Sequence, residues 1–546
     1  MKQGTRASQV AFVIAMFVIG AGALWLRLSH LDARPMHTDE AVHALKLRDL
    51  LRGQYRYDPH EFHGPTLLYF TLPLLRINSA SDIADINETT LRLVPALFGV
   101  GLIVLLLLLR DGLRAPALLY AALLTAISPA MSYYARYYIQ ETLLVFFSFA
   151  TVVALWRYVQ SGKTAWCLVA GACLGLMHAT KETWILSLFA MLPATGLAAL
   201  WTRRIDGLRV GWIQRLKTRP ILGALALGCL VSVLCYSTFL RHPQGVLDSF
   251  KAYATYLSRG GGDSIHVHPW NYYLSILAYF RNGPGPWWSE ALILVLFVIG
   301  ALASLWRHGT ESAWASHVAH PGLARFLTFY TLLLAITYAV LPYKTPWCLL
   351  GFLQSGILVA GIGALVCVRA MPGRVLKTAM AVLLVAATVQ LTNQAMAANS
   401  PRFAADRRNP YVYAHSSTDV ADFGRQMEDI AASIPNGHQM LVAIVAPDAW
   451  PLPWYLRRFK NVGFWNDAND PALKAALPEA GVVIASTDLQ PAVQKLLRAA
   501  KSEYSYQEQT RSLRPTVFFA ANIRDDIWQA FLKRQETSRA NAGETP

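Results

Sequence analysis

The apolar run VAFVIAMFVIGAGALWL, residues 10–26, decides the class of this fold. It carries no charge and approaches the about 20 residues that a helix needs to cross a bilayer. A second run, LRLVPALFGVGLIVLLLLL, occupies residues 91–109. Charged residues make up only 15% of the chain, against about 25% in average soluble domains, and the mean hydropathy is +0.33. These features predict an α-helical polytopic membrane protein.

Eleven apolar segments are candidates for transmembrane helices. They are residues 8–28, 91–109, 115–132, 141–156, 165–179, 183–201, 220–240, 290–306, 325–341, 347–368 and 375–391. The apolar piece 65–75 is too short to span and is expected at the membrane interface. No small-residue cleavage site follows the first run, which is therefore predicted to be retained as a span. All six cysteines lie in apolar runs and are expected to be buried small hydrophobes.

The basic residues predict the orientation of the spans. With a cytoplasmic N-terminus, the loops that fall inside hold Arg110, Arg114, Arg157, Lys163, Arg203, Arg204, Arg209, Arg215, Lys217, Arg219, Arg307, Arg369, Arg374 and Lys377. Acids such as Asp206 are few there, and replacement of Asp206 by Asn is expected to be near neutral. Short cytoplasmic loops rich in Lys and Arg are typical of membrane proteins. The formal charge of +16 is therefore assigned to topology rather than to nucleic-acid binding, in a multi-pass protein of the inner (plasma) membrane.

Three long segments fall on the opposite, extracytoplasmic side. The first is a large loop, residues 27–90, the second runs from Arg241 to Ser289, and the third is the polar tail after about residue 391. The tail contains strand-length apolar runs and helical patterns, at 441–446, 481–486 and 517–521 and at 418–433 and 492–500. We expect a transmembrane domain over 1–391 and a small soluble α/β domain over 392–546.

Unusual polar groups gather on this predicted outer face. Asp39 and Glu40 are adjacent carboxylates beside the first span, which suits a general base or a metal site. They are equally compatible with solvated acids at a helix start capped by Thr38.

Three further charged residues, Glu141, Lys181 and Glu182, abut apolar runs directly. Charges at the ends of spans tend to face a protein interior or a wet cavity. The plainer alternatives are a pair between Glu141 and Arg136, and an interfacial ion pair between Lys181 and Glu182.

Cations on this face are candidates to hold a phosphate, because cations stabilise a phosphate leaving group. The candidates are Arg136, Lys181 and Lys344. The loop histidines, His63 among them, match no standard metal-ligand spacing. The aromatic run Tyr133–Tyr138 is most simply an interfacial belt.

At these residues the chain resembles the GT-C superfamily of polytopic glycosyltransferases, which includes protein O-mannosyltransferases and lipid A aminoarabinose transferases. The resemblance rests on a first span followed by a long outer loop that opens with Asp39-Glu40, and on an acid at a later span start, Glu141. A closer likeness is to a bacterial and archaeal family described as flippase-activity-associated. It is carried by the segments His37–Ala41, Tyr57–Pro59, His63–Pro65, Arg136–Glu141, Thr180–Glu182 and Tyr343–Trp347.

The resemblance implies an inverting transfer of a sugar from a polyprenyl-phosphate donor to an acceptor hydroxyl outside the cytoplasm. Asp39 would be the base, with Glu40 and Glu141 as further catalytic residues. The substrate-binding residues would be Arg136, Tyr137, Lys181, Glu182, His63, Lys344 and Trp347. The partners would be the bilayer, the lipid-linked donor, and a lipid, glycan or protein acceptor, and a divalent metal ion is a possible cofactor.

A transporter or flippase component that moves lipid-linked sugars without chemistry is the alternative function. Transporters typically show repeats and ionisable groups near the bilayer midplane. This sequence shows no repeat, and its ionisable residues cluster at span ends on one side, which favours the enzyme.

Overall fold

The computed structural model is mostly helical and describes residues 6–60, 63–207, 216–259, 266–306, 320–499 and 504–542. Three of the predicted inner-loop cations, Arg209, Arg215 and Arg307, lie outside these residues. The helices are α1 (Arg6–Leu28), α2 (Thr38–Leu51), α3 (Thr66–Ile77), α4 (Glu88–Leu106), α5 (Ala115–Ile127), α6 (Pro129–Tyr134), α7 (Glu141–Ser161), α8 (Thr164–His178), α9 (Trp184–Ile205), α10 (Thr218–Tyr236), α11 (Gln244–Arg259), α12 (Tyr272–Ala278), α13 (Ala291–Leu305), α14 (Pro321–Val340), α15 (Leu350–Ala370), α16 (Gly373–Ala398), α17 (Thr418–Ala431), α18 (Leu452–Tyr455), α19 (Pro471–Ala476), α20 (Gln490–Ala499) and α21 (Asp525–Ala542).

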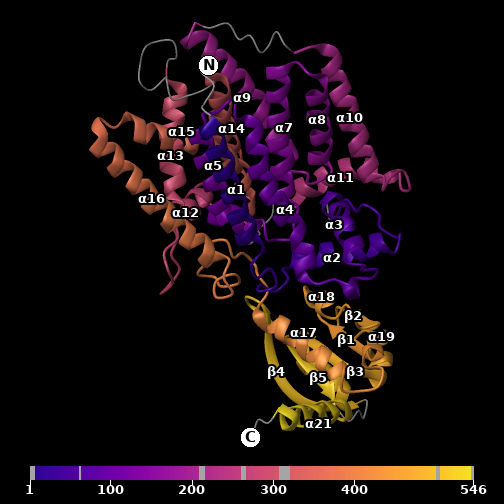
Figure 1. Ribbon diagram of the computed structural model, residues 1–546. Coiled ribbons are helices and arrows are strands. Elements are labelled where there is room, and N and C mark those ends of the chain that lie inside the picture. Colours follow the sequence, from indigo (N-terminus) through magenta and orange to yellow (C-terminus); the bar gives the residue numbers. More distant parts are fainter. Residues whose placement is uncertain are drawn as a thin grey trace. The chain divides into compact units, whose positions relative to one another are not determined.

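The chain divides into two compact units (Figure 1). The helical unit consists of Met1–Leu31, Gln54–Arg76 and Thr89–Tyr413. The mixed unit consists of Ala414–Pro546 together with Asp32–Gly53 and Ile77–Glu88. Two pieces of the predicted outer loop are thus built into the same unit as the C-terminal strands. The boundary between 391 and 392 stays a prediction.

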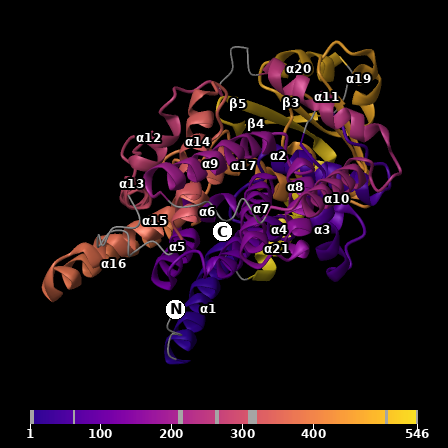
Figure 2. The ribbon, with the colours of Figure 1, turned by 90° about the horizontal axis from the view of Figure 1, so that it is seen from above.

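The helical unit is a bundle of apolar helices. In the described part of the chain, eight helices are long and apolar enough to cross a membrane, α1 and α16 among them. Three of the predicted spans correspond to shorter apolar helices, α5, α8 and α13. Figure 2 shows α1 and α16 at the outside of the bundle, and most of their apolar surface is exposed accordingly. α15 forms the centre, because nearly its whole length is buried.

Small residues bring the helices of this bundle close together. A Cβ at Gly171 of α8 would lie 2.0 Å from the carbonyl oxygen of Ala224 on α10. A Cβ at Gly363 of α15 would lie 1.9 Å from the carbonyl oxygen of Leu296 on α13. Close backbone approach at small residues is how apolar helices associate in lipid, so these glycines set the spacing of both pairs.

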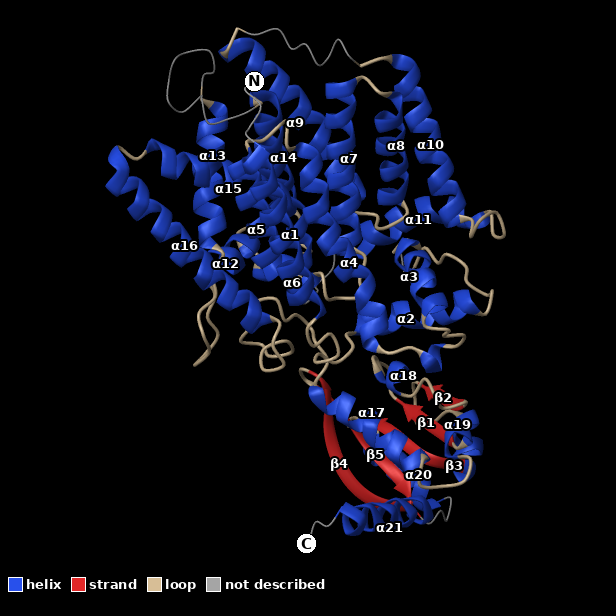
Figure 3. Cartoon of the chain, viewed as in Figure 1, coloured by secondary structure: helices blue, strands red, loops and turns tan. Residues whose placement is uncertain are grey.

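The mixed unit is built on a five-stranded sheet (Figure 3). Its strands are β1 (Leu441–Val445), β2 (Asn461–Trp465), β3 (Ala480–Ser486), β4 (Tyr504–Arg514) and β5 (Val517–Arg524). The order is β2-β1-β3-β5-β4, with β2, β1 and β3 parallel and β5 antiparallel to both β3 and β4. The predicted α/β fold of the tail is therefore confirmed, while β2 and β4 were missed.

One expectation is wrong in this structure. The tyrosines of Tyr133–Tyr138 are buried rather than belted at an interface, and the hydroxyls of Tyr133 and Tyr134 donate to the carbonyls of Ala404 and Tyr411 at 2.7 and 2.9 Å. Their rings fill the bundle beneath the segment that follows α16.

The carboxylate of Asp206 is fully buried and paired with Arg325 of α14. Its two oxygens accept from the guanidinium at 2.6 and 3.0 Å. Arg325 also donates to the carbonyls of Ser304 and Trp306 at the end of α13. The pair thus fastens the ends of three helices.

Candidate active site

The buried ionic centre of the helical unit consists of Glu141, Lys181 and Glu182, which are buried, and of His63, whose side chain is 20% exposed. Glu141 is the first residue of α7, and Lys181 and Glu182 lie in the turn between α8 and α9. The ammonium of Lys181 donates to Oε2 of Glu141 at 2.6 Å, and the two residues are 6% and 2% exposed. Nδ1 of His63 lies 3.3 Å from Oε1 of Glu182.

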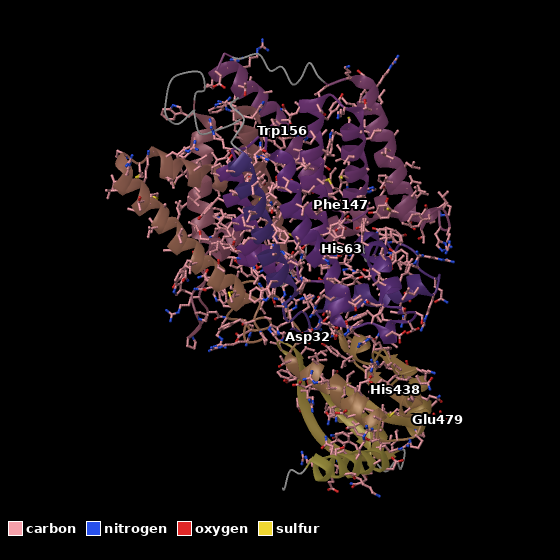
Figure 4. The ribbon with its side chains drawn as sticks, viewed as in Figure 1. Asp32, His63, Phe147, Trp156, His438 and Glu479 are labelled. Atoms are coloured by element: carbon pink, nitrogen blue, oxygen red, sulfur yellow. The ribbon has the colours of Figure 1, made fainter. Side chains whose placement is uncertain are left out.

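The backbone brings His63 to this centre. His63 and Lys181 form an antiparallel bridge, in which the amide of Gly64 donates to the carbonyl of Thr180 at 3.1 Å. A Cβ at position 64 would lie 2.1 Å from the carbonyl oxygen of Ala179, so only glycine fits this approach. In Figure 4, His63 lies below Trp156 and Phe147 of α7. The centre therefore sits where α7 begins and α8 ends.

The electrostatics of the centre favour charged groups. Burial alone would lower the pKa of Lys181, but the neighbouring carboxylate of Glu141 raises it well above its ordinary value. Buried charges are tolerated when they are paired and hydrogen-bonded. The centre thus contains a preformed pair of opposite charges in an apolar bundle, and this pair of Glu141 with Lys181 is neither of the two pairs considered from the sequence.

Arg136 serves as an anchor for backbone carbonyls. Its guanidinium donates to the carbonyls of Leu26, His30 and Asn399 at 3.3, 2.7 and 3.2 Å. It thereby ties the end of α1 to the end of α16. These three carbonyls accept hydrogen bonds from the guanidinium. That Arg136 binds a phosphate stays a prediction.

Lys344 and Trp347 lie in the segment just before α15, and Tyr137 contacts Trp347 from the segment before α7. The buried ammonium of Lys344 donates to the carbonyl of His268 at 3.0 Å and to that of Leu341. The rings of Trp347 and Tyr137 contact each other, with centroids 5.9 Å apart. Trp347 also meets Tyr413, whose hydroxyl bonds to His266 at 2.6 Å. These residues form an aromatic cluster with a cation at its edge.

The remaining predicted pair, Asp39 and Glu40, lies at the start of α2 in the mixed unit. Glu40 is fully buried, pairs with Arg34 at 3.0 Å and accepts from the amide of His37 at 3.0 Å. His37 in turn caps the helix, because its Nδ1 accepts from the amide of Asp39 at 3.1 Å. The capping residue is therefore His37 rather than Thr38.

Asp39 differs from its neighbour in exposure. Its carboxylate is 38% exposed and lies 3.8 Å from Nδ1 of His37. A buried, paired carboxylate such as Glu40 holds structure, whereas a half-exposed one on a capped helix can meet a substrate. The structure thus separates two acids that the sequence left equivalent.

The sequence alone did not point to two groups around Asp39. One is Arg34, whose pairing with Glu40 could have been suspected from their closeness in the chain. The other is Arg514, which donates to the hydroxyl of Thr38 at 3.2 Å and pairs with Asp448. No local signal marks a residue that far along the chain.

A metal site was left open by the sequence. Among the described residues, no group of three or more His, Cys, Asp or Glu side chains is arranged to hold a metal ion.

One family model matches this chain. Residues 74–236 match the family described as dolichyl-phosphate-mannose-protein mannosyltransferase. No protein with a curated description matches the sequence significantly.

Solved structures match over nearly the full length. ArnT from Cupriavidus metallidurans bound to undecaprenyl phosphate is similar with a TM-score of 0.60 and 14% identity, over 95% of this chain and 98% of that one. Its apo state gives 0.58 and 14%, over 94% and 98%. The apo oligosaccharyltransferase of Archaeoglobus fulgidus gives 0.54 and 13%, over 92% and 73%. The predicted GT-C fold is thus confirmed, and so is the resemblance to GT-C glycosyltransferases.

Proposed function

We propose that this chain is a membrane glycosyltransferase that moves a sugar from a polyprenyl-phosphate donor to an acceptor hydroxyl, with inversion, on the extracytoplasmic side. The observation that carries the proposal is the buried ionic centre of Glu141, Lys181, Glu182 and His63, within a fold shared with glycosyltransferases. The family-model match over residues 74–236, which includes three of these four residues, supports the same class.

On the donor side, Lys181 is the proposed partner of the lipid phosphate. An ammonium has three N–H donors, and Glu141 accepts from one of them at 2.6 Å. The pair holds Lys181 charged in an apolar setting, where a cation stabilises developing phosphate charge more strongly than in water. Arg136 and Lys344 are proposed as supporting cations, and Tyr137 and Trp347 as the aromatic surface for the sugar.

On the acceptor side, Asp39 is the proposed general base. Its helix begins with a cap from His37, and Glu40 is fixed by Arg34, so the segment that carries Asp39 is held in place. Glu40 is proposed as the residue that positions this segment, and Glu182 with His63 as hydrogen-bonding groups for sugar hydroxyls.

The proposed step is a single displacement. The carboxylate of Asp39 takes the proton of the acceptor hydroxyl while the hydroxyl oxygen of the acceptor bonds to the anomeric carbon. The bond from that carbon to the phosphate oxygen breaks, and its electron pair leaves with the polyprenyl phosphate. One displacement on the opposite face inverts the anomeric carbon.

The test is to incubate the purified full-length protein in detergent with a panel of polyprenyl-phosphate sugars and to measure released polyprenyl phosphate. General-base catalysis typically contributes about 10²–10⁴-fold, so Asp39→Asn should lower release by about two orders of magnitude or more. Asp49→Asn is the matched control, because Asp49 lies on the same helix, half exposed, and pairs only with the neighbouring Arg48 among the contacts described.

The outcomes are distinct. A folded Asp39→Asn variant that retains near-normal release would refute the base assignment. A folded wild-type protein that consumes no donor of the panel, yet moves one across vesicle membranes, would replace the enzyme with the flippase alternative.

A further inference from the structure

The mixed unit contains a cavity that none of the predicted site residues lines. Its volume is about 450 Å³, and its walls come from α2, from α18 and from the segments after β1 and β2. A cavity of this size accommodates a small organic ligand. Asp39 and Glu40 also belong to α2 but do not line the cavity.

The cavity lies at the edge of the sheet where parallel folds bind ligands. β1 and β2 are parallel, and the residues after each, from Ala446 to Trp450 and Asn466, line it. The chain goes from β1 outward to β2 and then crosses back to β3 on the other side of β1. Ligands of open α/β sheets bind beyond the carboxyl ends of strands where the strand order reverses in this way.

The walls are basic. Three cations line the cavity, Arg48, Arg457 and Lys460, against one acid, Asp448. That acid is already paired with Arg514. Arg48 contacts Asp49 only at a half-exposed position, where ion pairs contribute little. The cavity therefore carries a positive charge that no lining carboxylate compensates.

Aromatic rings complete the lining. Phe464 of β2 is 51% exposed, and Trp450 is half buried. Arg457 lies 3.9 Å over the ring of Trp454 and donates to the carbonyls of Ile86 and Trp454, so its guanidinium is fixed in place. The flat apolar faces of these aromatic rings, beside a fixed cation, suit a sugar ring that presents C–H groups on one face and carries a negatively charged group.

We infer that this cavity is a second binding site, for a saccharide that carries a phosphate or a carboxylate. The sugar face packs on Phe464 and Trp450, and the anionic group is held by Lys460, Arg48 and Arg457. The inference that the cavity binds such a saccharide does not depend on the chain being a catalyst. The further inference that the saccharide is part of the acceptor rests on the proposed function.

Calorimetric titration of the full-length protein in detergent, with no donor present, tests the inference. The probes are mannose 6-phosphate, glucuronate, mannose and inorganic phosphate. Both charged sugars should bind at least about tenfold more tightly than mannose and than inorganic phosphate, because only they use both the cations and the rings.

Matched variants identify the site. Lys460→Gln should weaken both charged sugars at least about fivefold and leave mannose unchanged, since a charge-assisted hydrogen bond is lost. Phe464→Ala should weaken all three sugars and leave phosphate unchanged. Lys474→Gln is the control, because Lys474 is an exposed cation of the same unit that does not line the cavity.

Equal affinity for mannose 6-phosphate and mannose would overturn the inference. So would phosphate binding as tightly as its sugar ester, or an equal loss in the Lys474→Gln variant. Arg48→Gln replaces Lys460→Gln should the latter fail to fold. A protein that binds the charged sugars yet transfers nothing would refute only the proposed function.

Discussion

Replacing Glu141 by Gln tests the ionic centre most directly. The change keeps the shape of the side chain and removes its charge, which leaves the buried ammonium of Lys181 without its carboxylate at 2.6 Å. Removing one partner of a buried pair typically costs about 3–5 kcal/mol. Unfolding entropies of about 2.1 cal/mol/K per residue convert this cost into a loss of roughly 5 °C in Tm for a unit of several hundred residues.

A double-mutant cycle separates structure from catalysis. Lys181→Gln alone should also destabilise, because Glu141 is then buried without its cation. The variant that carries both substitutions should recover about 1–3 kcal/mol relative to the sum of the single changes, since two neutral amides can hydrogen-bond to each other. Thermal melts of the detergent-solubilised variants give the stability, and release of polyprenyl phosphate gives the activity.

Stability and transfer together distinguish a structural role of the pair from a role of Lys181 in binding the donor. If the pair is purely structural, the double variant regains transfer along with stability. If Lys181 holds the donor phosphate, the double variant regains stability while transfer stays low by about two orders of magnitude or more. A single Glu141→Gln variant with unchanged Tm and unchanged transfer would refute both the pairing and the role.

Three further predictions concern the helix cap at His37, the close backbone approach at Gly64 and the orientation of the chain in the membrane. Burial lowers the pKa of His37 below its ordinary 6.5, so the folded mixed unit keeps this histidine neutral. The stability that the neutral histidine gives is present above about pH 6.5 and is lost as the pH falls. The His37→Asn variant should retain the helix cap and should flatten this pH dependence of Tm. Gly64→Ala should destabilise by about 1–3 kcal/mol, because its Cβ meets the carbonyl of Ala179 at 2.1 Å, and an unchanged melt would contradict the bridge. Single cysteines at the exposed positions Ser161 and Glu479, in a background without native cysteines, should differ in intact cells: only the second should react with an impermeant reagent, and labelling at Ser161 would contradict a cytoplasmic N-terminus.

The strands of the mixed unit show how far a local pattern reaches. β1, β3 and β5 were predicted because each is an apolar run of strand length, and β1 and β3 are buried almost throughout. β2 was missed because it is a short edge strand, NVGFW, in which no residue is fully buried. β4 was missed because its sequence, YSYQEQTRSLR, is largely polar and it lies at the other edge. Edge strands hold their place through backbone hydrogen bonds, which the side-chain pattern does not reveal.

The sequence by itself determined the membrane class, the positions of the apolar helices and the charged residues that abut their ends. These follow from composition and local periodicity, because a span must be apolar over its whole length. Only the tertiary structure decided which charges pair. The sequence allowed a pair of Glu141 with Arg136 and one of Lys181 with Glu182 as alternatives to a functional role. In the structure Glu141 pairs with Lys181, and Glu182 lies beside His63. A buried charge needs a partner of opposite charge. Which partner it has depends on which turns the helix packing brings together. Close backbone contacts, such as that of Gly64 with Ala179, bring together residues that are far apart in the sequence, and no local pattern reveals such a contact.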